Sequence, residues 1–199
     1  GTGAQAGSTV PNPPANLVAG TDFEQRLRNL KQQFAQSPET PFTSRQLADA
    51  TAAGDLESMK LLLEHGVDPN TSSGEPLAGT CIFTAVRYDQ PAALDLLLKK
   101  GGKLDKRCER DTTVLNAAAW HGNLEMIRNL LDKGCDVNAM AAGLQETGGI
   151  WLPIGTPLHA IGIRGLTAAG KILIEAGANV NAACPDSGHT PLHMAARFD

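Results

Sequence analysis

One four-residue motif constrains the fold of this chain more than any other feature. Thr-Pro-Leu-His occupies residues 156–159 and returns letter for letter at 190–193. Weaker copies begin at Thr80 and Thr113, so the four copies start at 80, 113, 156 and 190, with intervals of 33, 43 and 34 residues. A period near 33 residues indicates a repeat solenoid, in which each repeat forms one structural layer. The interval of 43 then contains an insertion of ten residues, because 43 − 33 = 10.

A second signal has the same spacing. A leucine- or isoleucine-rich run that ends in glycine follows the copies at 80, 113 and 156, and the glycines at 101, 134 and 177 each lie 21 residues after the start of their copy. Gly66 ends an earlier run of this kind, which places a first, degenerate copy at Arg45, because 66 − 21 = 45. Each repeat is therefore expected to hold two helices, and glycine lets the chain turn back after the second.

These patterns resemble the ankyrin-repeat family over roughly residues 44–199. The resemblance rests on the two Thr-Pro-Leu-His motifs, on Gly-Asn-Leu-Glu at 122–125, and on endings of the form Gly-x-Asp/Asn-x-Asn at 66–70, 134–138 and 177–181. It implies an all-α solenoid of stacked helix-turn-helix layers with one long finger loop. The expected repeats are 45–79, 80–112, 113–155 with an insertion at 140–155, 156–189, and a partial repeat at 190–199.

Several residues depart from the family pattern. Asp89 replaces the glycine between the two helices of its repeat, and Phe83 replaces the motif histidine. Ile161 and Gly162 stand where the family has two alanines. These two substitutions predict overpacking at Ile161 and a loosened helix at Gly162.

The first 43 residues precede the repeats. Residues 1–20 are rich in Gly and Pro and are expected to be disordered, because they cannot bury enough apolar surface. In the segment 21–43, Thr21 and Glu24 fit a capping box, and apolar residues at 23, 27, 30 and 34 follow at helical spacing. We expect a helix to about residue 36 and then a linker. We favour a helix that caps the first repeat over one that binds a partner.

Composition argues against several classes of protein. The net charge is −4 and the two signs are mixed along the chain, which argues against nucleic-acid binding. No apolar run reaches the roughly 18 residues of a membrane span, so no membrane insertion is expected. The four cysteines form no Cys-x-x-Cys pair, which favours reduced thiols in a cytoplasmic or nuclear protein. No cofactor or metal is predicted, and the chain is expected to be monomeric in isolation.

No catalytic signature is present in the sequence. It lacks the phosphate-binding loop, the nucleophile elbow and the zinc-protease motif. His159 and His193 have no serine, cysteine or paired acid placed with them. The resemblance implies a structural role for both, with hydrogen bonds to the backbone across layers. The chain is therefore predicted not to be an enzyme.

The resemblance also implies a binding surface. In ankyrin repeats, the two residues before the inter-helix glycine project onto the concave side. Here these residues are Arg87 and Tyr88, Trp120 and His121, Ile163 and Arg164, and Arg197 and Phe198, with Trp151 of the insertion and Arg110 of a finger turn as further candidates. Tyr, Trp and Arg are the residue types that dominate binding hot spots. The alternative is that the aromatic rings only pack against neighbouring helices, and we favour binding.

Two functions agree with these features. The favoured one is a non-catalytic interaction module that binds a partner protein or peptide through the concave face and the finger loops. The alternative is a regulatory or targeting arm of a larger multidomain enzyme or membrane protein. A weaker third option is a homodimer built by the 21–36 helix and the insertion. The last repeat stops at Asp199 before a second helix, so a longer natural chain is expected.

Overall fold

The computed structural model describes residues 25, 28–30, 32, 35–36, 42–72, 79–108, 111–141, 155–185 and 187–198. Their regular structure is helical, with two isolated β-bridges. The described residues from 25 to 108 form one compact unit, and those from 111 to 198 form another. The all-α architecture expected from the sequence is confirmed in both units.

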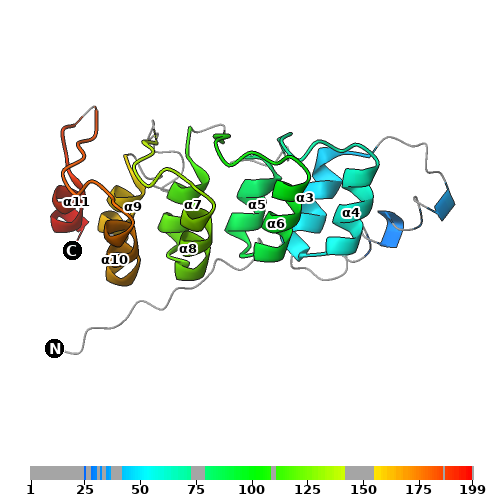
Figure 1. Ribbon diagram of the computed structural model, residues 1–199, viewed down its shortest axis with the longest axis horizontal. Coiled ribbons are helices and arrows are strands. Elements are labelled where there is room, and N and C mark those ends of the chain that lie inside the picture. Colours follow the sequence, from blue (N-terminus) through cyan, green and yellow to red (C-terminus); the bar gives the residue numbers. More distant parts are fainter. Residues whose placement is uncertain are drawn as a thin grey trace. The chain divides into compact units, whose positions relative to one another are not determined.

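The described part of the first unit contains two helix pairs after residue 42 (Figure 1). Helix α3 (Ser44–Ala53) pairs with α4 (Leu56–Glu64), and α5 (Cys81–Arg87) pairs with α6 (Pro91–Lys99). Because α3 also contacts α5 and α4 contacts α6, the first helices form one layer and the second helices form another. The largest fully buried side chains of this unit are Leu47, Met59, Leu62, Ile82, Leu94 and Leu97.

The second unit repeats this arrangement. Helix α7 (Val114–His121) pairs with α8 (Leu124–Asp132), and α9 (Pro157–Arg164) pairs with α10 (Thr167–Glu175). Helix α11 (Pro191–Phe198) packs against α9. The interior is filled by Leu115, Met126, Ile127, Leu130, His159 and Leu173.

The first repeat begins earlier than the constant spacing predicted. The N-cap of α3 is Thr43, two residues before Arg45. Gln46 completes a capping box there, because its Oε1 accepts from the Thr43 backbone N–H at 2.9 Å and its own N–H donates to the Thr43 hydroxyl at 3.3 Å. Helix α3 is correspondingly longer than its counterparts, so it still ends at Gly54 as expected.

The turn between paired helices requires a left-handed residue. Gly54, Gly122 and Gly165 supply it with φ of 69°, 72° and 62°. Asp89 adopts φ of 52° at the same position, a conformation that aspartate tolerates better than most residues with a side chain. Pro91 is the first residue of α6, a position at which the backbone N–H has no partner within the helix.

Asparagine side chains join adjacent repeats within each unit. The Asn70 amide donates to the Gly101 carbonyl at 3.0 Å and accepts from the Lys103 N–H at 2.9 Å. Asn138 makes the equivalent bonds to Gly177 at 3.2 Å and Asn179 at 2.7 Å. The asparagines of the endings at 66–70 and 134–138 therefore bridge the backbone of two successive turns.

The structure changes the interpretation of residues 161 and 162. A Cβ at Gly162 would lie 2.6 Å from the Pro191 carbonyl oxygen, so glycine is what allows α11 to approach the backbone of α9. Ile161 is 5% exposed, and Gly170 of α10 lies opposite it, where a Cβ would be 3.2 Å from Ile161 Cγ2. The predicted overpacking is relieved by Gly170, and Gly162 serves helix packing.

Two expected features are described only in part. The described residues between 25 and 36 are helical, and Leu30 is 3% exposed, in agreement with the apolar stripe. The insertion begins and ends at an antiparallel bridge between Ala141 and Gly155, whose backbone hydrogen bonds measure 2.9 and 3.1 Å. Residues 1–24 and 142–154, the latter with Trp151, lie outside the described residues.

Candidate functional site

Six of the candidate residues lie at the C-terminal ends of first helices in the second unit. Trp120 and His121 end α7, Ile163 and Arg164 end α9, and Arg197 and Phe198 end α11. Helix α9 contacts both α7 and α11, so the three ends are neighbours (Figure 1). All six side chains are half-buried or exposed. We call these six residues the first-helix ledge.

Stacked cation and aromatic groups organise the first-helix ledge. The Arg164 guanidinium carbon lies 5.2 Å from the centroid of the Trp120 ring and so links α9 to α7. The Arg197 guanidinium lies 5.7 Å from the Phe198 ring. Stacking occupies the flat face of a guanidinium but leaves its N–H edges able to donate. Within the described residues, neither arginine forms an ion pair.

The remaining candidates do not belong to the first-helix ledge. Arg87 ends α5 in the first unit, and its guanidinium lies 5.8 Å from the ring of Tyr88. These two residues form a separate cation–aromatic pair with the same local geometry. Trp151 and Arg110 lie outside the described residues.

His159 is held in a structural hydrogen-bond network. The Thr156 backbone N–H donates to its Nδ1 at 3.1 Å, which requires that nitrogen to be an acceptor. Nε2 therefore carries the proton and donates at 3.1 Å to the carbonyl of His189, the residue just before the next Thr-Pro-Leu-His motif. The ring is fully buried, and burial lowers the pKa of His159. The neutral imidazole links the start of α9 to the backbone that leads into α11, as the family resemblance implied.

Other residues occupy the same position in other repeats. Asn116 donates to the Gly155 carbonyl at 2.8 Å and accepts from the Thr113 hydroxyl at 2.6 Å, so an amide performs the cross-layer role of the histidine. Phe83 has no group that can do so. The hydroxyl of Thr80, three residues before it, is buried and has no hydrogen-bond partner in the described part of the chain. The Phe83 substitution is visible in the sequence, but its effect on Thr80 is not.

Thiol and metal chemistry find little support in the described part of the chain. None of the four cysteines forms a disulfide. Burial raises the pKa of Cys81 to about 12 and that of Cys135 to about 11, so both thiols are protonated at neutral pH. Across the described residues, no group of three or more His, Cys, Asp or Glu side chains is placed to hold a metal ion.

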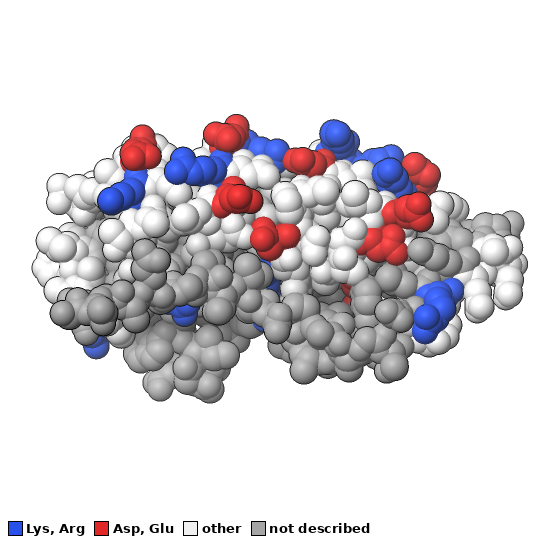
Figure 2. Space-filling model, turned by 90° about the horizontal axis from the view of Figure 1, so that it is seen from below, with Lys and Arg blue, Asp and Glu red and all other residues white. Residues whose placement is uncertain are grey.

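Charge on the described surface is mixed. Figure 2 shows lysine and arginine side chains interspersed with aspartate and glutamate on the face that it presents. That pattern gives no region of one sign on this face for the phosphates of a nucleic acid. No helix in the described ranges is long and apolar enough to cross a membrane.

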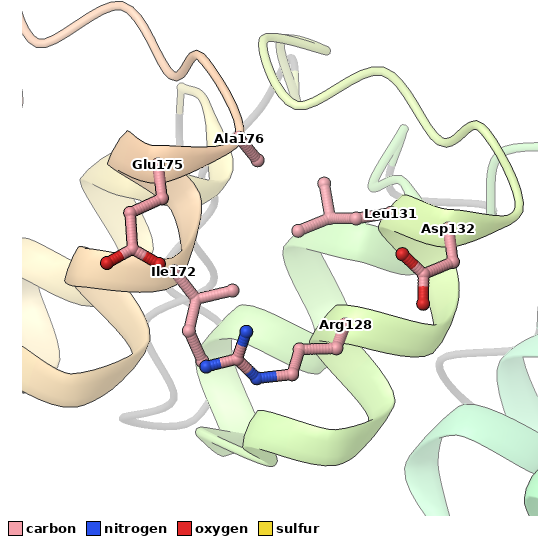
Figure 3. Close-up of a pocket in the computed structure, with 6 residues that line it drawn as sticks. All are labelled: Arg128, Leu131, Asp132, Ile172, Glu175 and Ala176. Atoms are coloured by element: carbon pink, nitrogen blue, oxygen red, sulfur yellow. The ribbon is translucent and has the colours of Figure 1, made fainter.

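A groove between α8 and α10 was not predicted from the sequence. Its volume is about 270 Å³, and it is lined by Arg128, Leu131, Asp132, Ile172, Glu175 and Ala176. Figure 3 shows the carboxylates of Asp132 and Glu175 on opposite helices, with the Arg128 side chain reaching from α8 toward α10. The sequence does not mark these positions, because charged residues on a solvent-exposed helix surface follow the same pattern as those that line this groove. The groove combines acids with a cation, whereas the first-helix ledge contains no acid.

Stacked helix pairs, threonine N-caps and cross-layer bonds from the motif position together define an ankyrin-repeat architecture. The profile of the ankyrin-repeat family, described as three copies of the repeat, matches residues 47–141. Ankyrin repeats therefore occupy this segment of the chain. The family assignment and the solenoid fold expected from the sequence are confirmed.

Three curated relatives share part of this sequence. Human "Ankyrin repeat and SOCS box protein 16" is 36% identical over 128 residues, which are 64% of this chain and 25% of that protein. "Ankyrin repeat domain-containing protein SAT10" of Stachybotrys chartarum is 31% identical over 49% of this chain and 5% of its own length. The Arabidopsis thaliana "Putative E3 ubiquitin-protein ligase XBAT35" is 30% identical over 59% of this chain and 24% of its own. The chain thus spans a quarter or less of each.

Proposed function

We propose that this chain is a non-catalytic module that binds a partner protein or peptide through the ends of its first helices and its finger loops. Ankyrin repeats are protein-interaction modules. The observation that carries the proposal is the stacking of Arg164 on Trp120 across two repeats, with both side chains accessible. A rigid aromatic ring and a pre-positioned guanidinium are the groups that most often anchor an interface.

The remaining candidates extend this proposed surface. His121, Ile163, Arg197 and Phe198 adjoin the Trp120–Arg164 pair on the first-helix ledge. Arg87 and Tyr88 offer a second cation–aromatic pair in the first unit. Trp151 and Arg110 enter the proposal from their sequence positions alone. The proposed extent of the repeat domain is 44–199, and the proposed compartment is intracellular, since none of the cysteines forms a disulfide.

Affinity capture with matched variants tests this proposal. The chain is immobilised and exposed to an extract of its source cells as wild type, Trp120→Ala, Tyr88→Ala and Leu124→Ala. Leu124 lies on α8 and is 38% exposed, so it controls for the loss of an exposed apolar side chain elsewhere. Loss of a hot-spot residue costs about 2 kcal/mol, roughly a thirtyfold loss of affinity.

The expected result is a partner retained by wild type and Leu124→Ala but lost from Trp120→Ala, with circular dichroism unchanged. Loss from Tyr88→Ala as well would extend the surface to the first unit. Equal retention by all four proteins would contradict the proposal.

A second function is favoured by the relatives. Two of them carry names that refer to a SOCS box and to a ubiquitin ligase, and the matched segments are a quarter of their lengths. The chain would then be the recognition or regulatory arm of a larger protein. An antibody raised against residues 111–198 tests this on source-cell extract: a band well above 20.8 kDa supports it, and a band at 20.8 kDa opposes it.

A further inference from the structure

We propose that the segment bound by the first-helix ledge is an acidic peptide, which presents carboxylates to Arg164 and Arg197 from residues about three positions apart. The inference rests on the proposed function and adds the chemistry of the partner. It is carried by the separation of charge between the two helix layers of the second unit.

The first helices of this unit carry no acidic residue. Helices α7, α9 and α11 contain two arginines and three histidines, and neither aspartate nor glutamate. The acids described in the unit lie on the second helices or in turns: Asp111, Glu125, Asp132, Asp136 and Glu175. Glu146, Asp186 and Asp199 lie outside the described residues. The layer that forms the first-helix ledge therefore offers only cationic and neutral side chains.

The guanidinium groups of Arg164 and Arg197 are available to bind carboxylates. Arg164 is exposed, and its position over Trp120 at 5.2 Å fixes the guanidinium before any partner arrives. The remaining N–H edges match the two oxygens of a carboxylate. Arg197, in the next repeat, lies 5.7 Å from the ring of Phe198, its neighbour in the same helix. Within the described residues no carboxylate already occupies either guanidinium.

The spacing of the two arginines sets the spacing of the acids. Both lie at the C-terminal ends of helices that pack side by side, α9 and α11. Packed helices lie about 8–10 Å apart. An extended segment in the polyproline II conformation advances about 3.1 Å per residue with three residues per turn, so residues three positions apart share a face. Such a segment crossing the two helix ends would therefore present acids about three residues apart to the two arginines, while its apolar side chains meet Trp120 and Phe198.

The second-helix layer supplies the matched control. Arg128 of α8 and Lys171 of α10 are also exposed, and they lie on second helices of successive repeats in the same unit. The carboxylates of Asp132 and Glu175 accompany Arg128 at the α8–α10 groove (Figure 3). Removing Arg128 and Lys171 changes the net charge as much as removing Arg164 and Arg197, but it leaves the first-helix ledge intact.

Selection from a random peptide library displayed on phage tests the inference. The library is panned on wild type, R164A/R197A, R128A/K171A and W120A, each checked for folding by circular dichroism. We expect wild type to enrich peptides with two acids about three residues apart. Affinity should fall about tenfold for R164A/R197A, which corresponds to two exposed ion pairs, and should weaken with added salt. R128A/K171A should bind as wild type does.

The outcomes separate this inference from the proposed function. Enriched peptides without acids that need Trp120 would overturn the acidic partner and leave the interaction site standing. Peptides that bind all four proteins equally would overturn both. A lack of any enrichment over the starting library would also count against both.

Discussion

The third residue after each capping threonine controls the polar groups at the start of a first helix. His159, Asn116 and Gln46 each accept a hydrogen bond from the threonine before them. His159 and Asn116 in addition donate to the backbone carbonyl just before the next motif. Phe83 can do neither, and the Thr80 hydroxyl has no hydrogen-bond partner among the described residues. The same backbone position therefore stabilises or weakens a repeat according to one side chain.

His159 predicts a pH dependence of stability. Burial lowers its pKa in the folded chain below the 6.5 of an ordinary histidine. The unfolded chain therefore binds the proton more readily, and the free energy of unfolding falls as pH drops below about 6.5, by at most about 1.4 kcal/mol per pH unit. The contribution is fully present above that pH. Urea unfolding of the wild type between pH 8 and pH 5 measures it.

The repeat array supplies its own control for this prediction. His159→Asn places at this position the amide that Asn116 uses in the preceding repeat, so it keeps a cross-layer donor and removes the titrating group. We expect the difference in unfolding free energy between wild type and variant to shrink on acidification. A constant difference from pH 8 to pH 5 would show that His159 does not carry the effect.

Thr80→Val is expected to stabilise the chain by about 1 kcal/mol. Thr80 is 6% exposed, and its buried hydroxyl makes no hydrogen bond to any residue that the structure describes. The substitution replaces this hydroxyl with a methyl group of similar size. Thr113→Val is the matched control, since the Thr113 hydroxyl donates to Asn116 at 2.6 Å and accepts from its N–H at 3.2 Å. That variant should lose about 1 kcal/mol. Denaturant midpoints that move in the same direction for both would refute this account.

At the scale of elements, the contact between α9 and α11 depends on a missing side chain. Gly162 lets the backbone of α11 approach, and a Cβ there would meet the Pro191 carbonyl oxygen at 2.6 Å. Gly170 differs, because its Cβ would meet only a side-chain methyl of Ile161 at 3.2 Å. Backbone cannot yield as a side chain can, so the two glycines have different tolerance for alanine.

Gly162→Ala is therefore expected to destabilise the chain by about 1–3 kcal/mol. Gly170→Ala should be close to neutral, because the gain in helix propensity of about 1 kcal/mol offsets the shift of Ile161. Thermal unfolding of both variants beside wild type measures the contrast. Equal effects from the two substitutions would mean that the close approach of α11 is not the reason for Gly162.

Local sequence signals predicted the helices, whereas the contacts between helices could be seen only in the structure. Threonine caps, glycine turns and leucine spacing predicted the helix pairs because each acts within a few residues. The N-cap of the first repeat was predicted two residues too late, because a constant repeat length does not reveal that α3 is longer. The sequence also did not show that Gly170 makes room for Ile161, because the two residues lie on different helices.

The sequence predicted where the candidate residues lie along the helices, but not how their side chains contact one another. The register placed Trp120 and Arg164 at the ends of successive first helices, where the structure has them. It did not reveal that Arg164 stacks on Trp120, because that contact depends on side-chain conformations across two repeats. The sequence shows that α7, α9 and α11 contain no acidic residue. Only the structure shows that these helices lie side by side, so that the surface formed by their ends carries no acid from them.

At the scale of the molecule, each unit has a layer of first helices and a layer of second helices. In the second unit the first-helix layer carries stacked arginines and no acid, whereas the second-helix layer mixes both signs around a groove. Binding through the first-helix layer is the central claim. Two isoleucines distinguish the layers: Ile163 lies on α9 in the first-helix ledge, and Ile174 lies on α10 and is 50% exposed.

Site-specific photo-crosslinking from these two positions tests that claim most directly. A benzophenone amino acid replaces Ile163 in one protein and Ile174 in another, and each is irradiated in source-cell extract after its folding is checked. The account predicts a discrete adduct from position 163 that is absent from position 174 and is competed by unlabelled wild type but not by W120A. An adduct from position 174 alone would place the partner on the second-helix layer and contradict the account.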